Sequence, residues 1–312
     1  MDRIDKPAAI ISSTGRTGTL FFARFLHSVL DNATVVHEPD VFHFSPRKGK
    51  GLAGAVRQLR TAGAFNFFIR KYLGGWSVIK LSDRRMRCQI GDDAARRRLL
   101  ELRQSFVQRR PTSCYVESNC GYYGLMDLLP GVFSHHRSCF IIRDGRDWVR
   151  SKVNWGEMYG KGWPRRLIAH NWPRGDQFPD DPLASNWSSL GRFEKCCWAW
   201  TKFNGFAIDL LEANPEARLF YFEDIFRSEG RLKNMIGLLE HILSHTGIPM
   251  PQREKILEWQ SRRVHSSRKV FPAWPEWSRT QKATFREICG PLMKRLGYDT
   301  DVYPITEMKA GE

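Results

Sequence analysis

The sequence predicts an α/β fold in which helices cover both faces of a central parallel β-sheet. Short apolar runs rich in β-branched residues alternate with longer segments of helical periodicity, as in chains built from successive β-α-β units. Each run is bounded by polar residues and has the length of a buried parallel strand. The predicted strands are Ala8–Ser12, Thr34–Val36, Ser77–Leu81, Cys114–Val116, Ser138–Ile142 and Leu219–Phe222.

Segments with helical periodicity lie between these strands and near the end of the chain. They are Gly18–Leu30, Leu52–Tyr72, Asp93–Gln108, Trp148–Tyr159, Phe193–Glu212, Leu232–His245 and Gln281–Leu296.

The segment from Gly160 to Gly191 is different, because it has little periodicity and many prolines and tryptophans. An irregular stretch of that length inside a compact domain is usually a functional lid or a disordered insert. Its tryptophans favour an ordered lid, since disordered segments are poor in aromatic residues. We therefore expect one domain over residues 1–303 with a lid at about 160–191, and a polar tail over residues 304–312.

Charge and cysteine content narrow the class of protein. The 49 Lys and Arg residues against 33 acidic residues leave a formal net charge of +16, which suggests an anionic partner. The seven cysteines form no C-x-x-C pair and suit a reducing compartment. No zinc-ligand spacing and no apolar run long enough for a signal peptide or membrane span is present. The expectation is a cytoplasmic protein without a metal.

A glycine-rich turn, Ser13-Thr14-Gly15-Arg16-Thr17-Gly18-Thr19, joins the first predicted strand to the first predicted helix. The backbone N–H groups of such a turn converge, and the helix N-terminus adds positive potential, so an anion is expected here. Gly15 and Gly18 permit close approach, Arg16 can bind phosphate oxygens, and Thr17 and Thr19 can donate hydroxyls. A strand, a phosphate-binding turn and a helix in this order predict a P-loop-type fold.

The lysine of a Walker A sequence is missing, because no lysine precedes Thr19. A kinase or NTPase would normally need that lysine. The alternative is a tight turn whose glycines serve packing alone.

A second strand, turn and helix start reads Ile142-Arg143-Asp144-Gly145-Arg146-Asp147, with Ser151 inside the helix that follows. A guanidinium at the strand end and a hydroxyl from the helix would together bind another phosphate. The alternative is a surface ion pair between Arg143 and Asp144 or Asp147.

Together the two motifs resemble those of the sulfotransferases that use 3′-phosphoadenosine 5′-phosphosulfate (PAPS). In that family the first loop holds the 5′-phosphosulfate, and the second motif, with a serine where Ser151 stands, holds the 3′-phosphate. Weaker similarities follow in the family's order as far as about residue 298. They are Cys197-Trp198-Ala199-Trp200, Tyr221-Phe222-Glu223-Asp224, Ser266-Ser267-Arg268-Lys269 and Leu296-Gly297-Tyr298.

The resemblance implies a set of cosubstrate contacts. Ser13 to Thr19 would hold the 5′-phosphosulfate, and Arg143, Ser151, Arg268 and Lys269 the 3′-phosphate, with PAPS as cosubstrate and no metal. In sulfuryl transfer, positioning and charge stabilisation dominate, as they do in phosphoryl transfer. Arg16 and the N–H groups of residues 17–19 would stabilise charge on the leaving phosphate oxygen.

The acceptor's proton requires a base, and Glu38 is the best candidate. It follows the second predicted strand, where ligand crevices of α/β sheets form, and several members of the family carry a glutamate here. His37 is the rival, and side chains of neighbouring residues in an extended segment diverge, so we expect only one to face the site. Asp83 is a lesser candidate and Glu117 a more distant one. Alternatively, Glu38 caps a turn before Pro39.

One departure from the family strengthens the case for glutamate. Cytosolic sulfotransferases carry Lys-Thr-His after the third strand, with the histidine as base, whereas this chain reads Lys80-Leu81-Ser82-Asp83. Ser82 cannot replace a histidine. Lys80 matches a lysine that steadies the transferring sulfuryl group.

The expected activity is transfer of a sulfuryl group from PAPS to a hydroxyl or amine of a small-molecule or carbohydrate acceptor, with neither nucleic acid nor membrane as partner. Tryptophans that can stack on an acceptor, although packing is the commoner role, are Trp155, Trp163, Trp172 and Trp187. The alternatives are a P-loop small-molecule kinase, a non-enzymatic basic nucleic-acid-binding protein, and a nucleotide-binding relative without activity. Dependence on Mg²⁺ and ATP would favour the first, and salt-dependent binding to random DNA the second.

Overall fold

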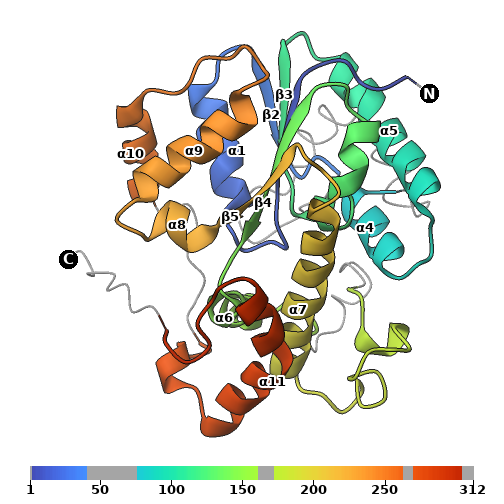
Figure 1. Cartoon of the computed structure of the whole chain (residues 1–312), viewed down its shortest axis with the longest axis vertical. Helices are drawn as coiled ribbons and strands as arrows, with labels where there is room; N and C mark the ends of the chain where they lie inside the picture. The colour runs from blue at the N-terminus through green and yellow to red at the C-terminus, as the bar shows by residue number, and fades with distance from the viewer. Residues whose placement is uncertain (1, 41–75, 161–171, 263–269, 304–312) are drawn as a thin grey trace, which may run out of the picture.

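The computed structural model contains one fully parallel sheet with helices on both faces (Figure 1). The structure describes residues 2–40, 76–160, 172–262 and 270–303. In these residues the strand order is β2-β3-β1-β4-β5. The strands are β1 (Ala8–Ser12), β2 (Ala33–His37), β3 (Cys114–Ser118), β4 (His136–Ile142) and β5 (Ala217–Tyr221). The predicted α/β class is therefore confirmed.

The described residues also contain nine α-helices and several 3₁₀ turns. The helices are α1 (Thr19–Val29), α4 (Val78–Met86), α5 (Asp92–Gln108), α6 (Gly145–Trp155), α7 (Arg192–Leu211), α8 (Phe222–Phe226), α9 (Arg231–Leu243), α10 (Arg253–Ser261) and α11 (Arg279–Arg295). The 3₁₀ turns are η2 (Cys120–Gly124), η3 (Met126–Gly131), η5 (Gly175–Gln177) and η6 (Trp274–Glu276). Within the described ranges, no helix is both long and apolar enough to cross a membrane.

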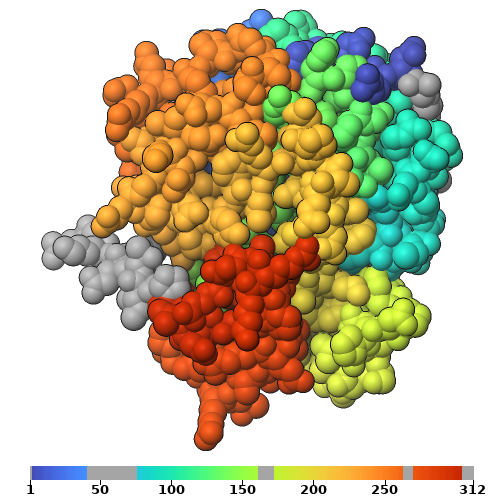
Figure 2. Space-filling view, viewed as in Figure 1, coloured from blue at the N-terminus to red at the C-terminus, as the bar shows by residue number. Residues whose placement is uncertain are grey.

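Alternation along the strands divides the core into two layers, one on each face of the sheet. Ala8 and Ile10 of β1 face a cluster built from α4, α5, α6, α7 and α11. Ala9 and Ile11 face the opposite cluster, built from α1, α9 and α10. Figure 1 shows these two groups of helices on opposite sides of the sheet, and in Figure 2 the C-terminal segments, yellow to red, form most of the visible face.

The strand expected over Ser77–Leu81 is wrong, because this segment begins helix α4. Ser77 caps the helix by accepting from the backbone N–H of Lys80, and the Asp40 carboxylate accepts from that of Val78 at 3.0 Å. Five of the six buried positions of α4, namely 78, 81, 82, 85 and 86, have helical spacing. Val78 and Ile79, whose apolar side chains suggested a strand, belong to the first turn of an amphipathic helix.

The other five predicted strands agree with the structure to within two residues at each end. Six predicted helices are present as well, whereas α8 and α10 were not predicted. The helix expected over 52–72 lies outside the described residues. In the irregular segment, residues 172–191 form turns and η5, and Trp187 is buried between Tyr159 and Trp198.

Candidate functional site

The two phosphate-binding motifs follow neighbouring strands near the middle of the sheet. β1 and β4 pair in parallel, with Ser12 beside Phe140, so the turns that follow them leave the same edge. The connection from β1 leads toward β2 on one side of the sheet, and the connection from β4 leads toward β5 on the other. In open α/β sheets, ligands bind in the crevice at such a reversal of direction.

The first motif has the backbone of an anion-binding turn. Gly15 and Gly18 have φ values of 80° and 89°, which only glycine adopts without strain. Arg16 has a φ of 62°, so a non-glycine residue is held in a left-handed conformation between them. Gly18 begins α1 without a side-chain cap, which leaves the first N–H groups of the helix for another acceptor.

Side chains of the first motif attach the loop to its surroundings. The Ser13 hydroxyl accepts from the Gly15 N–H at 3.0 Å, and the Thr14 hydroxyl donates to the Asn204 side chain on α7 at 3.1 Å. The Thr17 hydroxyl, which is buried, has no hydrogen-bond partner among the described residues. A buried hydroxyl without a hydrogen-bond partner is unusual in a folded protein. A ligand oxygen that accepts its hydrogen bond would explain it.

The structure brings the two motifs into direct contact. The Arg143 guanidinium donates to the Arg16 carbonyl at 2.8 Å, and Arg16 Nε donates to the Ser151 hydroxyl at 2.9 Å. The Trp148 indole donates to the Gly15 carbonyl at 2.8 Å. Arg16, Arg143 and Ser151, which sequence motifs far apart in the chain predicted, therefore form one cluster.

Positive charge is concentrated in this cluster. Burial lowers the pKa of Arg16, with the neighbouring Arg143 adding to the effect, and burial also lowers the pKa of Arg143. Both guanidiniums remain charged at neutral pH, because arginine does not lose its proton in proteins. Arg143 Nε is buried and has no partner within the described part of the chain. Two desolvated cations, one of them with an unused donor, favour an anion between them.

The surface pairing considered for Arg143 is present only in part. Arg143 lies 3.7 Å from the Asp147 carboxylate, while Arg227 forms the closer ion pair with that carboxylate and the Tyr303 hydroxyl donates to it at 2.8 Å. Asp144 pairs instead with Arg146 at 2.7 Å. Arg143 also lies over the ring of Phe222, 4.6 Å from its centroid.

Glu38 and His37 lie together at the end of β2, next to the first motif. The backbone turns at Glu38, whose φ is 41°, so the expectation that the two side chains diverge is wrong. His37 Nε2 lies 3.9 Å from the Glu38 carboxylate and 3.3 Å from the Thr19 hydroxyl, which places both base candidates beside the start of α1. Only 8% of Glu38 is exposed.

A buried ion network fixes the segment that carries Glu38. Arg103 of α5 binds both oxygens of Asp40, at 2.9 and 3.0 Å, and both oxygens of Glu117, at 2.7 Å each. Tyr115 and Tyr122 also donate to Glu117. These partners make Glu117 a member of the buried ion network. Removing one member of such a network lowers the stability of the fold, because it leaves a buried charge unpaired. The network holds the backbone two residues beyond Glu38.

The remaining residues predicted from sequence lie as follows. Asp83 is buried on α4 and accepts a hydrogen bond from the Tyr123 hydroxyl. Lys80 is exposed on α4, and the strand end on which its predicted role depended is absent. Ser82 donates to the Gly121 carbonyl and packs α4 against η2. Arg268 and Lys269 lie outside the described residues.

Sequence reasoning missed Lys152, the residue after Ser151. Its side chain is buried, and Nζ would lie 3.3 Å from a Cβ built on Gly15. Nζ also lies over three tryptophan rings, 4.8 Å from Trp148, 5.1 Å from Trp155 and 5.2 Å from Trp172. A local signal was present, because Trp148 and Trp155 stand four residues before and three residues after Lys152 on one helix.

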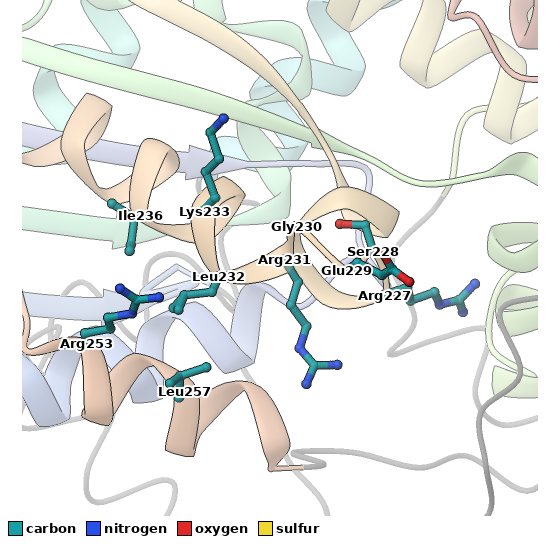
Figure 3. Close-up of a pocket in the computed structure, with 10 residues that line it drawn as sticks. All are labelled: Arg227, Ser228, Glu229, Gly230, Arg231, Leu232, Lys233, Ile236, Arg253 and Leu257. Carbon is teal, nitrogen blue, oxygen red and sulfur yellow. The ribbon is translucent and has the colours of Figure 1, made fainter.

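A basic hollow of about 880 Å³ lies beside the second motif, between the start of α9 and α10 (Figure 3). Four of its ten lining residues, Arg227, Arg231, Lys233 and Arg253, are basic, and Glu229 is acidic. Because Arg227 also pairs with Asp147, the hollow begins next to helix α6.

The described residues contain no group of three or more His, Cys, Asp or Glu side chains able to hold a metal ion.

Comparison with solved structures gives eight similar chains, two of which are described here. No protein-family model matches the chain, and no curated protein matches it. The sulfotransferase domain from the curacin biosynthetic pathway matches 96% of this chain over 99% of its own length, at 12% identity and a TM-score of 0.47. The sulfotransferase domain from the Synechococcus PCC 7002 olefin synthase matches 96% of this chain over 97% of its own, at 13% identity and a TM-score of 0.46.

Proposed function

We propose that this chain is a sulfotransferase that transfers a sulfuryl group from PAPS to a hydroxyl or amine of a small-molecule or carbohydrate acceptor. The observation that carries the proposal is the contact between the two motifs through Arg16, Arg143 and Ser151. A nucleotide with anionic groups on both its 5′ and 3′ positions needs two adjoining anion sites. The phosphate loop of a kinase forms a single anion site and carries a lysine, which this loop lacks.

The residues present fit such a nucleotide. The unpaired Thr17 hydroxyl and Arg143 Nε are buried donors, and the uncapped start of α1 supplies backbone N–H groups. In this assignment residues 13–19 hold the phosphosulfate, and Arg143 and Ser151 hold the 3′-phosphate, together with Arg268 and Lys269. PAPS supplies the sulfuryl group when it is bound.

The chain's own chemistry is positioning, charge stabilisation and removal of one proton. Arg16 and the N–H groups of the first turn of α1 stabilise negative charge on the phosphate oxygen that leaves. The Glu38 carboxylate takes the acceptor's proton as the bond from the acceptor oxygen or nitrogen to sulfur forms and the bond from sulfur to the phosphate oxygen breaks. The products are the sulfated acceptor and adenosine 3′,5′-bisphosphate. His37, 3.9 Å from Glu38, is the second candidate for the proton.

The proposal is tested by calorimetric titration with adenosine 3′,5′-bisphosphate, 5′-AMP, ADP and Mg-ATP in the absence of any acceptor. We expect the bisphosphate to bind at least ~10²-fold more tightly than 5′-AMP, because charge-assisted bonds to the 3′-phosphate are lost with it. A preference for Mg-ATP would identify a kinase. Binding to none of them, together with salt-dependent binding to random DNA, would favour a nucleic-acid-binding protein.

Thr17→Val tests whether the loop is built to receive an oxygen atom. Valine has the same shape but no hydroxyl, so the apo protein should gain about 1 kcal/mol of stability while its affinity for the bisphosphate falls by ~3–10-fold. Urea unfolding and calorimetry measure the two effects.

Thr246→Val is the matched control, because the buried Thr246 hydroxyl already donates to the Leu243 carbonyl and accepts from the Ile248 N–H. That variant should lose about 1 kcal/mol of stability and keep its affinity. Unchanged bisphosphate affinity in Thr17→Val would contradict the assignment of Thr17 to the ligand.

A further inference from the structure

Lys152 is a buried cation that pairs with no carboxylate of the described residues. It is 3% exposed and forms three cation–π contacts. Within the described part of the chain, Nζ has neither a hydrogen-bond acceptor nor an ion-pair partner. Buried lysines are rare unless they are paired, because removing an ammonium group from water is expensive. A lysine that only filled space would extend its amine toward water.

Lys152 also lies at a particular end of the candidate site. Nζ sits against the Cα of Gly15, where any side chain in place of the glycine hydrogen would meet it at 3.3 Å. Cys120 lies against the same position on Gly15, 3.8 Å from that Cβ, and hydrogen-bonds to Glu38. Lys152 and the base candidate are therefore both linked to this side of the anion-binding loop.

In a group transfer, the group that moves must lie between the nucleotide and the base that activates the acceptor. Lys152 adjoins the loop at Gly15, where Cys120 connects the loop to Glu38. We propose that Lys152 contacts the sulfuryl group of the bound donor and supplies, from helix α6, the ammonium charge that the loop itself lacks. This inference rests on the proposed function. The charge comes from the helix of the second motif instead of the loop of the first.

The three tryptophan rings explain how an unpaired ammonium is kept in place before the donor binds. Cation–π contacts stabilise a desolvated ammonium without neutralising its charge, so the charge remains available to an incoming anion. Trp148 is itself fixed, because its indole donates to the Gly15 carbonyl. The loop, the rings and the ammonium thus form one preorganised unit.

The arrangement has a consequence for pH dependence. Burial lowers the pKa of Lys152 to about 8, with Arg16 lowering it further and Cys120, Cys196 and Glu38 opposing the shift. Below pH 8 the ammonium is charged and attracts the donor. As the pH rises through about 8, the free protein loses that charge, and the contribution of Lys152 to donor affinity is lost with it.

The test compares PAPS with adenosine 3′,5′-bisphosphate, which has no sulfuryl group, by calorimetry on the full chain. Lys152→Met should lower the affinity for PAPS by ~10–30-fold and the affinity for the bisphosphate by less than ~3-fold. Between about pH 7 and about pH 9, PAPS affinity should fall in the wild type and stay level in Lys152→Met. Lys152→Arg, whose charge does not titrate, should bind PAPS without this pH dependence.

Lys195→Met is the matched control, since Lys195 also lies over a tryptophan ring, 5.4 Å from Trp187. It should leave both affinities unchanged, and a thermal unfolding transition verifies that each variant is folded. Equal losses for PAPS and the bisphosphate, or no loss of PAPS affinity, would overturn the assignment of Lys152 to the sulfuryl group. A wild type that binds neither nucleotide would overturn the proposed function itself, which is a distinct result.

Discussion

Arg143→Ala is expected to lower the affinity for adenosine 3′,5′-bisphosphate by ~10²–10³-fold and to leave the fold intact. The size of the effect follows from two roles of this side chain. It holds the first motif by donating to the Arg16 carbonyl at 2.8 Å, and its Nε is an unused buried donor. Calorimetry with the bisphosphate measures the loss, and far-UV circular dichroism with a thermal transition verifies the fold.

Arg227→Ala is the control for this prediction. Arg143 and Arg227 both interact with Asp147, and both lie over Phe222, at 4.6 and 5.6 Å. Of the two, Arg143 is the one that contacts the first motif. Arg227→Ala should therefore reproduce the loss of charge and packing but reduce affinity by less than ~10-fold. Equal losses in the two variants would mean that general positive charge, and not a 3′-phosphate contact by Arg143, governs binding.

The central strands were predictable because their burial is recorded in the local sequence, whereas β2 and β5 are only partly buried. All five residues of β1 are buried, so a continuous apolar run between polar residues identifies it, and β4 follows the same rule. Helix α4 was misread because what begins it is partly remote. The Asp40 carboxylate reaches the N–H of Val78 from 38 residues earlier in the sequence, and no local pattern contains that contact.

Some features of the candidate site could likewise be predicted from the sequence, and others could not. Arg16, Arg143 and Ser151 were predictable, because each belongs to a short motif whose residues are neighbours in sequence. The closeness of His37 and Glu38 was not predictable, since it depends on a left-handed backbone at a residue other than glycine. Burial of Lys152 depends on Gly15 and Trp172, which lie far from it in the chain. The roles of Arg268 and Lys269 stay predictions.

Glu38→Gln separates binding from proton transfer. Glutamine keeps the size of the side chain but cannot accept a proton, so turnover should fall by ~10²-fold or more while bisphosphate affinity stays within ~3-fold of the wild type. The acceptor for this assay is first identified by screening hydroxyl and amine compounds with labelled PAPS. The rate is then measured with saturating PAPS, so that the variant's effect on turnover is separated from any effect on binding.

His37→Gln is the matched variant, because His37 Nε2 lies 3.9 Å from the Glu38 carboxylate and 3.3 Å from the Thr19 hydroxyl. If Glu38 is the base and His37 only orients it, His37→Gln should lower turnover by ~10-fold or less. Normal turnover in Glu38→Gln with a large loss in His37→Gln would transfer the role to the histidine. If both variants turned over normally, Asp83 would be next to test, although its carboxylate already accepts the Tyr123 hydroxyl. Glu38 is the proposed base because it is buried and hydrogen-bonds to Cys120, which lies against Gly15 of the loop.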